Sequence, residues 1–231
     1  MERKVTKRYG HGQAHLAEGV TVVIDVIRAY TNAAFAFAGG VREVIPVRTV
    51  EEGFAWRKRD PEVLLGGEVG GAKIEGFDLS NSPEAMEQAD VAGRRLVMRT
   101  GSGTQGAVLA THASQLVFGS FPVAEATVRW IEGHTEGPIT LLAMMSPNGP
   151  DGDEDVALAD YLALRLTGAR PDPRPFLDRV RDSDAGRMAW EDAHPWITPG
   201  DVERACRIDC FDFAMVADRV GNDIVGTIRQ P

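Results

Sequence analysis

The chain has 231 residues, of which 43% are hydrophobic and 26% are charged. These fractions are ordinary for a globular protein and exclude a disordered chain, so we expect it to fold around a sizeable core. Its formal net charge of -9 argues against nucleic acid as a partner, because nucleic-acid-binding proteins normally carry a basic face. No apolar run is long enough for a secretory signal or a membrane span, which predicts a cytoplasmic protein with no membrane partner.

Six stretches with the composition of strands follow one another along the chain, and most of them lead into a helix pattern. The expected strands are 21–27, 41–47, 62–68, 94–100, 115–120 and 138–145. The expected helices are 29–40, 49–60, 103–113, 123–134 and 153–166. This alternation predicts a single α/β domain over residues 1–231, with three layers and a largely parallel or mixed sheet covered by helices on both faces.

The composition changes in the segment 169–199, which is rich in proline and charge and is predicted to be a helical or loop-rich insertion. Its Trp190 and Trp196 suit a lid, a contact in a homodimer, or ordinary packing of two aromatic side chains. Residues 201–221 show a helix pattern, and a short final strand is expected in the sequence DIVGTI.

The first polar cluster lies at the end of the strand 21–27, where Asp25 interrupts an apolar run and Arg28 follows. A carboxylate in such a place usually has a metal ion, an arginine or several backbone donors as its partner. The alternative is a simple cap for the next helix. Because ligands bind outside the carboxyl ends of the strands in α/β sheets, we take both residues as candidate catalytic residues.

The second cluster is the loop GGEVGGAKIEGFDLSNSP at 66–83. Its glycines permit positive φ and a close approach of a ligand to the backbone. Three carboxylates lie in it: Glu68, Glu75 and Asp78. Such residues favour a hard cation, because Mg²⁺ takes oxygen ligands from one or two carboxylates, from water and from substrate phosphate. The alternative is a connecting loop that ends in a Ser-Pro helix start.

The third cluster is MRTGSGTQGAV at 98–108, where a strand enters a Gly/Ser/Thr turn that opens a helix. Backbone N–H groups and hydroxyls could hold an anion at this helix N-terminus, although a plain helix start explains the pattern equally well. The spacing is not that of a P-loop, so a nucleoside triphosphate is not expected. The candidate binding residues are Thr100, Ser102, Gly103 and Thr104.

The fourth cluster is GDEDVALADY at 152–161. Its acids occupy the first turn of an expected helix, where the helix dipole stabilises negative charge, so capping alone is one explanation. Their place after the strand 138–145 puts Glu154 and Asp155 on the same sheet edge as the other clusters and makes them candidate metal ligands.

Four motifs in this order resemble the 2-phosphosulfolactate phosphatase family: VVIDVIRA, GGEVGGAKIEGFDLSNSP, RTGSGT and GDEDVALADYL. The resemblance covers about residues 19 to 168, with a looser similarity in CFDFAMVADRVGNDIV. It implies a three-layer α/β fold and a Mg²⁺-dependent hydrolase. The founding activity of the family converts 2-phosphosulfolactate to sulfolactate and phosphate on the route to coenzyme M.

Carried onto this chain, the resemblance implies catalytic roles for Asp25, Arg28, Glu68 and Asp78. It implies metal binding by Asp25, Glu68, Asp78, Glu154 and Asp155. It implies substrate binding by Asn81, Ser82, Thr100, Ser102, Gly103 and Thr104. The expected partner is a small anionic phosphorylated metabolite.

The chain departs from the family pattern at three places. Val69 follows Gly67-Glu68 where the family has arginine, Gly101 and Ser102 replace Thr-Asn, and Tyr30 and Asn32 interrupt a run of threonines. Arg99 is a candidate substitute for the absent guanidinium. The alternative function is therefore a catalytically impaired member of the family that binds a small anionic metabolite.

Uncatalysed hydrolysis of phosphate monoesters is so slow that enzymes accelerate it by as much as about 10²¹-fold. Helix dipoles and hydroxyls cannot supply that factor, so we expect a metal ion to polarise the phosphoryl group and Arg28 to stabilise its oxygens. Water could attack with one carboxylate as general base. A covalent phosphoaspartate on Asp25 is the alternative, although the D-x-D-x-T pattern is absent.

Overall fold

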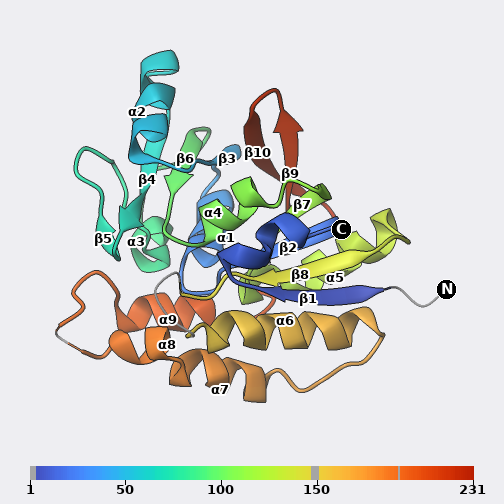
Figure 1. Ribbon diagram of the computed structural model, residues 1–231. Coiled ribbons are helices and arrows are strands. Elements are labelled where there is room, and N and C mark those ends of the chain that lie inside the picture. Colours follow the sequence, from blue (N-terminus) through green and yellow to red (C-terminus); the bar gives the residue numbers. More distant parts are fainter. Residues whose placement is uncertain (1–3, 147–150, 192) are drawn as a thin grey trace.

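A computed structural model describes residues 4–146, 151–191 and 193–231 of the chain (Figure 1). The strands are β1 (Val5–Tyr9), β2 (Gly19–Ile24), β3 (Glu43–Pro46), β4 (Leu64–Val69), β5 (Ala72–Lys73), β6 (Arg95–Arg99), β7 (Ala113–Gly119), β8 (Ile139–Ala143), β9 (Ala214–Val220) and β10 (Asp223–Arg229). The α-helices are α1 (Ala29–Ala38), α2 (Val50–Arg59), α3 (Pro83–Glu87), α4 (Gly103–Leu109), α5 (Ala124–His134), α6 (Asp153–Leu166), α7 (Arg174–Asp182), α8 (Asp184–Met188) and α9 (Pro199–Ala205). Two 3₁₀ turns are η1 (His11–Leu16) and η2 (Phe121–Val123).

The strands form one mixed sheet in the order β1-β8-β2-β7-β9-β10-β3-β6-β4-β5. Two groups of parallel strands are present, β1-β8-β2-β7 and β3-β6-β4. The antiparallel hairpin β9–β10 lies between them and pairs with β7 on one side and with β3 on the other. The sheet is therefore mixed, within the range that the sequence predicts.

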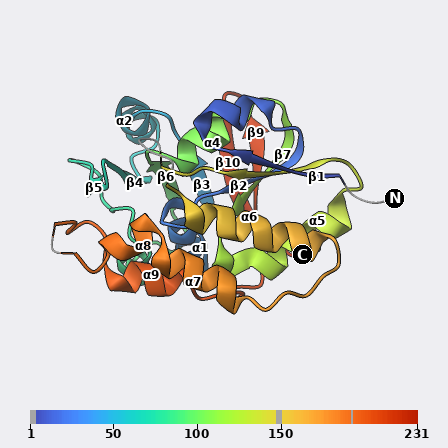
Figure 2. The same ribbon diagram turned by 60° about the horizontal axis from the view of Figure 1, so that its bottom comes forward.

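Helices cover both faces of the sheet, as the alternation of strands and helices predicts. Figure 2 shows α5 and α6 on one side of the strands and α4 with η1 on the other. The β-branched residues of β2 alternate between two hydrophobic cores, with Val22 and Ile24 in the core under α5 and α6 and Val23 in the core under α1 and α4. This three-layer α/β arrangement confirms the predicted fold class.

Local sequence explains where several helices begin. Thr49 accepts a hydrogen bond from the backbone N–H of Glu52 at the start of α2, and Ser82 does the same for Ala85 at α3. At α9, the N-cap Thr198 and Asp201 in the first turn form a capping box, with Pro199 as the first helical residue. These caps fix the loops that approach the carboxyl ends of the strands.

The structure corrects two predictions about the ends of the chain. Residues 201–221 are not one helix, because α9 ends at Ala205 and residues 214–220 form β9. Pairing with β7 and β10 buries Ala214 to Ala217 and overrides the local helix pattern. The strand β1 has no counterpart in the sequence prediction. No helix in the described ranges is long and apolar enough to cross a membrane.

Candidate active site

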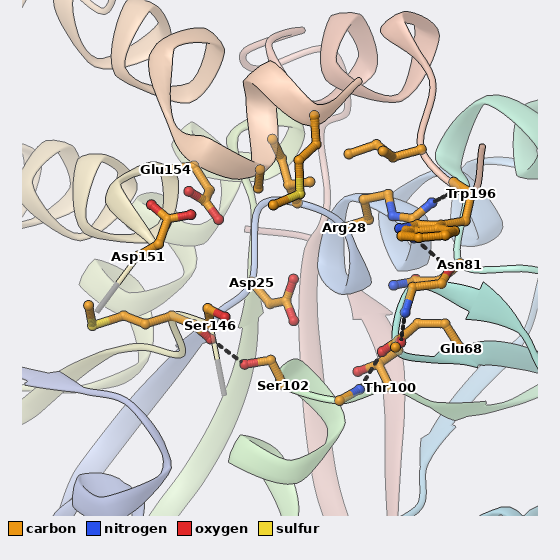
Figure 3. Close-up of a pocket in the computed structure, with 18 of the residues that line it drawn as sticks. Asp25, Arg28, Glu68, Asn81, Thr100, Ser102, Ser146, Asp151, Glu154 and Trp196 are labelled. Atoms are coloured by element: carbon orange, nitrogen blue, oxygen red, sulfur yellow. Dashed lines mark hydrogen bonds between the residues drawn. The ribbon is translucent and has the colours of Figure 1, made fainter. Parts of the chain in front are cut away.

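A cavity of about 380 Å³ lies where the carboxyl ends of β2, β4, β6 and β8 converge. Figure 3 shows Asp25 between Asp151 and Glu154 on one side and Arg28, Asn81 and Glu68 on the other. Among the described residues, five carboxylates line the cavity: Asp25, Glu68, Asp151, Glu154 and Asp155. The structure thus brings together polar residues from all four sequence clusters.

Asp25 lies just beyond β2 and is 5% exposed. Its Oδ1 accepts a hydrogen bond from the backbone N–H of Ala29 at 3.0 Å, and its Oδ2 accepts one from that of Gly103 at 2.6 Å. Burial raises the pKa of Asp25 to about 6 against the effect of these donors, and the nearby charge of Glu68 adds to the rise. Asp25 therefore caps α1 and also reaches the start of α4, so helix capping is part of its role.

Asp155 lies in the first turn of α6 and bonds to the backbone just beyond two neighbouring strands, β2 and β8. Its carboxylate accepts from the backbone N–H of Val26 at 2.7 Å and from that of Met145 at 2.9 Å. Burial, with the charges of Glu154 and Asp25, raises the pKa of this carboxyl well above its usual range. Both oxygens are bonded to backbone, which makes Asp155 a support for the strand ends.

Glu154 differs from Asp155 in its hydrogen bonding. Its side chain is 5% exposed, and Oε2 is buried with no hydrogen-bond partner among the described residues. Burial, with the charges of Asp151 and Asp25, raises its pKa to about 7. A carboxyl group with such a pKa can take up or release a proton near neutral pH. Simple capping of α6 therefore does not account for Glu154.

Glu68 belongs to β4, and its carboxylate joins two glycine loops. Oε2 accepts a hydrogen bond from the backbone N–H of Gly71 at 2.7 Å, and Oε1 accepts one from that of Gly101. The Oδ1 of Asn81, which also lines the cavity, is buried with no partner within the described chain. Asn81 thus presents a free amide oxygen in the same cavity.

The backbone N–H groups of the third cluster do bind anions, but the anions are side chains of this protein. Gly101 donates to Glu68, and Gly103 donates to Asp25. Thr100 and Thr104 bond each other through backbone N–H and hydroxyl groups. The loop therefore positions the carboxylates of the site, and these N–H groups are not free for a substrate.

Four residues predicted for the site do not line the cavity: Ser82, Asp78, Gly103 and Thr104. Asp78 is 36% exposed, pairs with Arg57 and accepts from the backbone N–H of Leu65 at 2.8 Å, so its carboxylate fixes the loop after β4. Ser82 caps α3 and donates to Asp201. The structure thus places these four residues around the cavity and not in its lining.

Arg28 lines the cavity, yet its guanidinium is largely committed to protein acceptors. It donates to the backbone oxygen of Trp196, to that of Gly71 at 3.1 Å and to the carboxylate of Asp201 at 3.3 Å. Three segments far apart in sequence therefore meet at Arg28. Asp201 is a partner of Arg28 that no motif in the sequence indicates.

Of the residues at the departures, Gly101 and Ser102 line the cavity, whereas Val69, Tyr30 and Asn32 do not. The side chain of Val69 is 52% exposed at the hairpin β4–β5. Arg99 donates through Nη1 to the backbone oxygen of Glu68 at 2.7 Å and does not line the cavity. The structure thus gives no support to Arg99 as a substitute for the absent arginine.

Sequence analysis did not name the residues of one wall of the cavity, which comes from α8 and from the segment between α8 and α9. Its lining residues are Ala185, Met188, His194, Trp196 and Ile197. The sequence marks this segment only by its change in composition, and the signal of Trp196 also fits a dimer contact. Asp151 was missed because it stands in a loop that carries no motif.

Buried carboxylates at the strand ends of a mixed α/β sheet define the chain as an α/β protein with an acidic centre. The family model of 2-phosphosulpholactate phosphatase matches residues 7–195. The chain therefore belongs to the 2-phosphosulfolactate phosphatase family, a family of phosphomonoester hydrolases.

Curated relatives agree with this assignment. A protein of Bacillus subtilis (strain 168) named "Probable 2-phosphosulfolactate phosphatase" is 30% identical over 222 residues, which cover 96% of each chain. A protein of the same name from Deinococcus radiodurans is 39% identical over 148 residues, which cover 64% of this chain and 61% of the relative. One from Caldicellulosiruptor saccharolyticus is 39% identical over 120 residues, or 52% of this chain and 50% of the relative.

Proposed function

We propose that this chain is a Mg²⁺-dependent phosphatase of a small acidic phosphomonoester, with 2-phosphosulfolactate, named in its relatives, as the first candidate. The charge of the cavity carries the proposal. Five carboxylates face Arg28, which already has protein partners. A phosphate monoester is itself anionic near pH 7, so its binding here requires an added cation.

The donor atoms in the cavity suit Mg²⁺, because they are carboxylate and amide oxygens. Within the described residues no three His, Cys, Asp or Glu side chains come together as a complete metal site. Mg²⁺ usually needs only one or two carboxylates, with water and substrate phosphate as further ligands. Asp25 and Glu68 would hold the ion, with Asn81 Oδ1 as a further oxygen.

When bound, Mg²⁺ would neutralise charge on the phosphoryl group and on the leaving oxygen. Hydrolysis breaks the ester P–O bond and forms one between phosphorus and a water oxygen. The proton of that water must reach the leaving alkoxide. Glu154 suits this transfer, because its Oε2 is buried and unpartnered in the described chain and its pKa is about 7. Arg28 adds positive charge beside the phosphate.

We place this reaction in the cytoplasm, with a small phosphorylated metabolite as the partner and no nucleic acid. The net charge of -9 argues against nucleic acid as a partner. One observation favours the alternative of an impaired, ligand-binding protein: the backbone donors of Gly101 and Gly103 are occupied by carboxylates of the chain itself.

The test is phosphate release from a panel of small phosphomonoesters, 2-phosphosulfolactate included, by the full chain with Mg²⁺ and with EDTA. We expect release that EDTA abolishes and Mg²⁺ restores. Release that EDTA leaves unchanged would contradict the metal. No release from any ester, together with ligands that still raise the melting temperature, would establish the binding alternative.

A further inference from the structure

A second cavity, of about 540 Å³, lies at the carboxyl end of β3 and shares no lining residue with the active-site cavity. Its lining comes from the end of β3, from α2 and from the hairpin β9–β10, and Figure 1 shows α2 and the hairpin on either side of β3. In α/β sheets, ligands bind outside the carboxyl ends of the parallel strands. The proposed phosphatase reaction makes no use of this cavity.

The charge of the second cavity is opposite to that of the active site. Three arginines and two carboxylates line it, which is a balance of +1 in a chain with a net charge of -9; they are Arg48, Arg59, Arg219, Glu52 and Asp223. The active-site cavity has five carboxylates beside Arg28 in its described lining. An anion is therefore favoured in the second cavity even when no metal ion is bound.

Two of the three arginines, Arg48 and Arg219, have no carboxylate partner within the described residues. The guanidinium of Arg48 makes no hydrogen bond or ion pair there. Arg219 donates through Nη2 to the backbone oxygen of Ala110 at 2.9 Å. The two acids already have partners, because Glu52 accepts from the backbone N–H of Arg48 at 2.8 Å and Asp223 lies 3.7 Å from Arg59. Two guanidinium groups are thus available to an anion.

The rest of the lining suits a small organic body attached to the anion. It consists of Pro46, Val47, Ala55, Trp56, Val108 and Ile224, together with Asn222. Arg59 lies over the indole of Trp56, with 3.9 Å between its Cζ and the ring centroid, so the indole and the ion pair of Arg59 form one fixed side. Guanidinium groups bind phosphate in a bidentate manner, which favours a phosphorylated ligand.

Gln105 connects the second cavity to the active site. Its Nε2 donates to the backbone oxygen of Arg48 at 3.1 Å and to that of Thr100 at 3.1 Å. Thr100 begins the loop whose backbone N–H groups bind the carboxylates of Glu68 and Asp25. A ligand that shifts Arg48 therefore acts on the carboxylate loop through a single side chain.

We propose that the second cavity binds a small organic phosphate dianion through Arg48 and Arg219, and that Gln105 transmits this binding to the loop of the active site. Binding at the second cavity does not depend on the proposed phosphatase function, whereas the effect on activity rests on it. The site makes hydrolysis respond to a phosphorylated metabolite that is bound away from the substrate.

Phenylphosphonate is the probe for binding, because its P–C bond is not hydrolysed. Calorimetry with the full chain in EDTA and low salt removes the metal ion that the active site requires and limits screening. Arg48→Gln and Arg219→Gln should each raise Kd at least about tenfold, since each removes a charge-assisted hydrogen bond. Arg42→Gln is the matched control, because Arg42 is exposed at the other end of β3 and lines neither cavity. No binding to the wild type, or an unchanged Kd in either cavity variant, would overturn the site.

Phosphate release with Mg²⁺ tests the connection, with the phosphomonoester that the chain hydrolyses best. Saturating phenylphosphonate should change kcat/KM of the wild type at least about fivefold. Arg48→Gln and Gln105→Leu should both abolish this change, while Gln105→Leu keeps the Kd of phenylphosphonate within about twofold. No change in the wild type, or a change that persists in Arg48→Gln and so arises at the active site, would overturn the connection. If no ester releases phosphate, the phosphatase function is wrong, and the calorimetry still decides whether the second cavity binds the anion.

Discussion

The guanidinium of Arg28 lies 3.3 Å from the carboxylate of Asp201, and this buried ion pair joins the turn after β2 to the first turn of α9. The side chains are 6% and 0% exposed. Asp201 also accepts from the hydroxyl of Ser82 and from the backbone N–H of Glu84, so a single carboxylate links α3, α9 and the cavity.

Asp201→Asn should therefore destabilise the protein strongly. It removes the carboxylate to which the buried Arg28 is hydrogen-bonded, and breaking a buried ion pair costs about 3–5 kcal/mol of unfolding free energy. Urea unfolding at pH 7 measures the effect. Asp172→Asn is the control, because the pair of Asp172 with Arg174 lies at the surface and should contribute nothing measurable. Equal unfolding midpoints of the two variants would show that the buried ion pair contributes no more to stability than the surface pair does.

Substitutions of Glu68 and of Asp78 should differ in their effect on activity. Glu68→Gln removes a carboxylate that lines the cavity and should lower kcat/KM with Mg²⁺ at least about 100-fold. Asp78→Asn alters the pair with Arg57 outside the cavity and should keep kcat/KM within a few-fold while lowering the melting temperature. Steady-state phosphate release measures both. A loss as large in Asp78→Asn as in Glu68→Gln would place Asp78 back in the site.

The metal-free protein should lose stability as the pH rises from about 4.5 to 7. Burial raises the pKa of Glu154 to about 7 and that of Asp25 to about 6, so in this window the folded state keeps protons that the unfolded state has released. Glu154→Gln has no titrating carboxyl group at this position. Its free energy of unfolding should therefore fall less between about pH 4.5 and 7 than that of the wild type, by up to about 3 kcal/mol. Urea unfolding in EDTA at several pH values measures it.

A control for this pH experiment is Asp172→Asn. A side-chain hydrogen bond from Arg174 lowers the pKa of Asp172, so this carboxylate is ionised in both states above pH 5. The variant should keep the wild-type slope. If Glu154→Gln keeps it as well, Glu154 releases its proton in the folded state at the same pH as in the unfolded state.

Two neighbouring glycines give a matched test of the contact with Trp196. Gly70 and Gly71 have φ of 61° and 89°, where alanine is strained in either case. A Cβ at Gly70 meets nothing within 4 Å, whereas a Cβ at Gly71 meets the indole of Trp196. Gly71→Ala should therefore raise KM for the phosphomonoester that the chain hydrolyses best at least about fivefold more than Gly70→Ala does. Equal KM values in the two variants would mean that Trp196 does not need this contact.

Asp25 should not form a phosphoryl adduct. Both of its oxygens accept backbone N–H groups, from Ala29 and Gly103, and attack on phosphorus would break one of these hydrogen bonds. Beryllium fluoride with Mg²⁺ mimics a phosphorylated aspartate, and fluorine NMR detects the complex. We expect no complex that depends on Asp25. A complex that disappears in Asp25→Asn would establish the covalent route.

Much of the fold could be predicted from local sequence. Each of the six expected strands overlaps an observed one, and the residues at the ends of four of them, β2, β4, β6 and β8, meet in one cavity. The β-branched run of β2 and the acids that open α6 carry this information locally. Long-range pairing could not be read in the same way, because the ladder of β9 with β7 overrides a helix pattern.

The site shows the same limit. Asp25, Glu68 and Glu154 follow from the rule that ligands bind at strand ends. Asp78 has a similar sequence context but turns to Arg57 and the backbone of Leu65, and only the packing of β4 reveals that. The contact of Arg28 with Asp201 joins residues 173 apart in the chain, a distance at which sequence patterns carry no signal.

The hairpin β9–β10 separates the two parallel groups of strands, and it is the last part of the sheet to leave the ribosome. Until it is made, β7 and β3 expose unpaired edges in the middle of the future sheet, a condition that favours aggregation. The cavity takes its lining residues from both groups of strands, so the hairpin that pairs with each group also helps to set the spacing of the carboxylates.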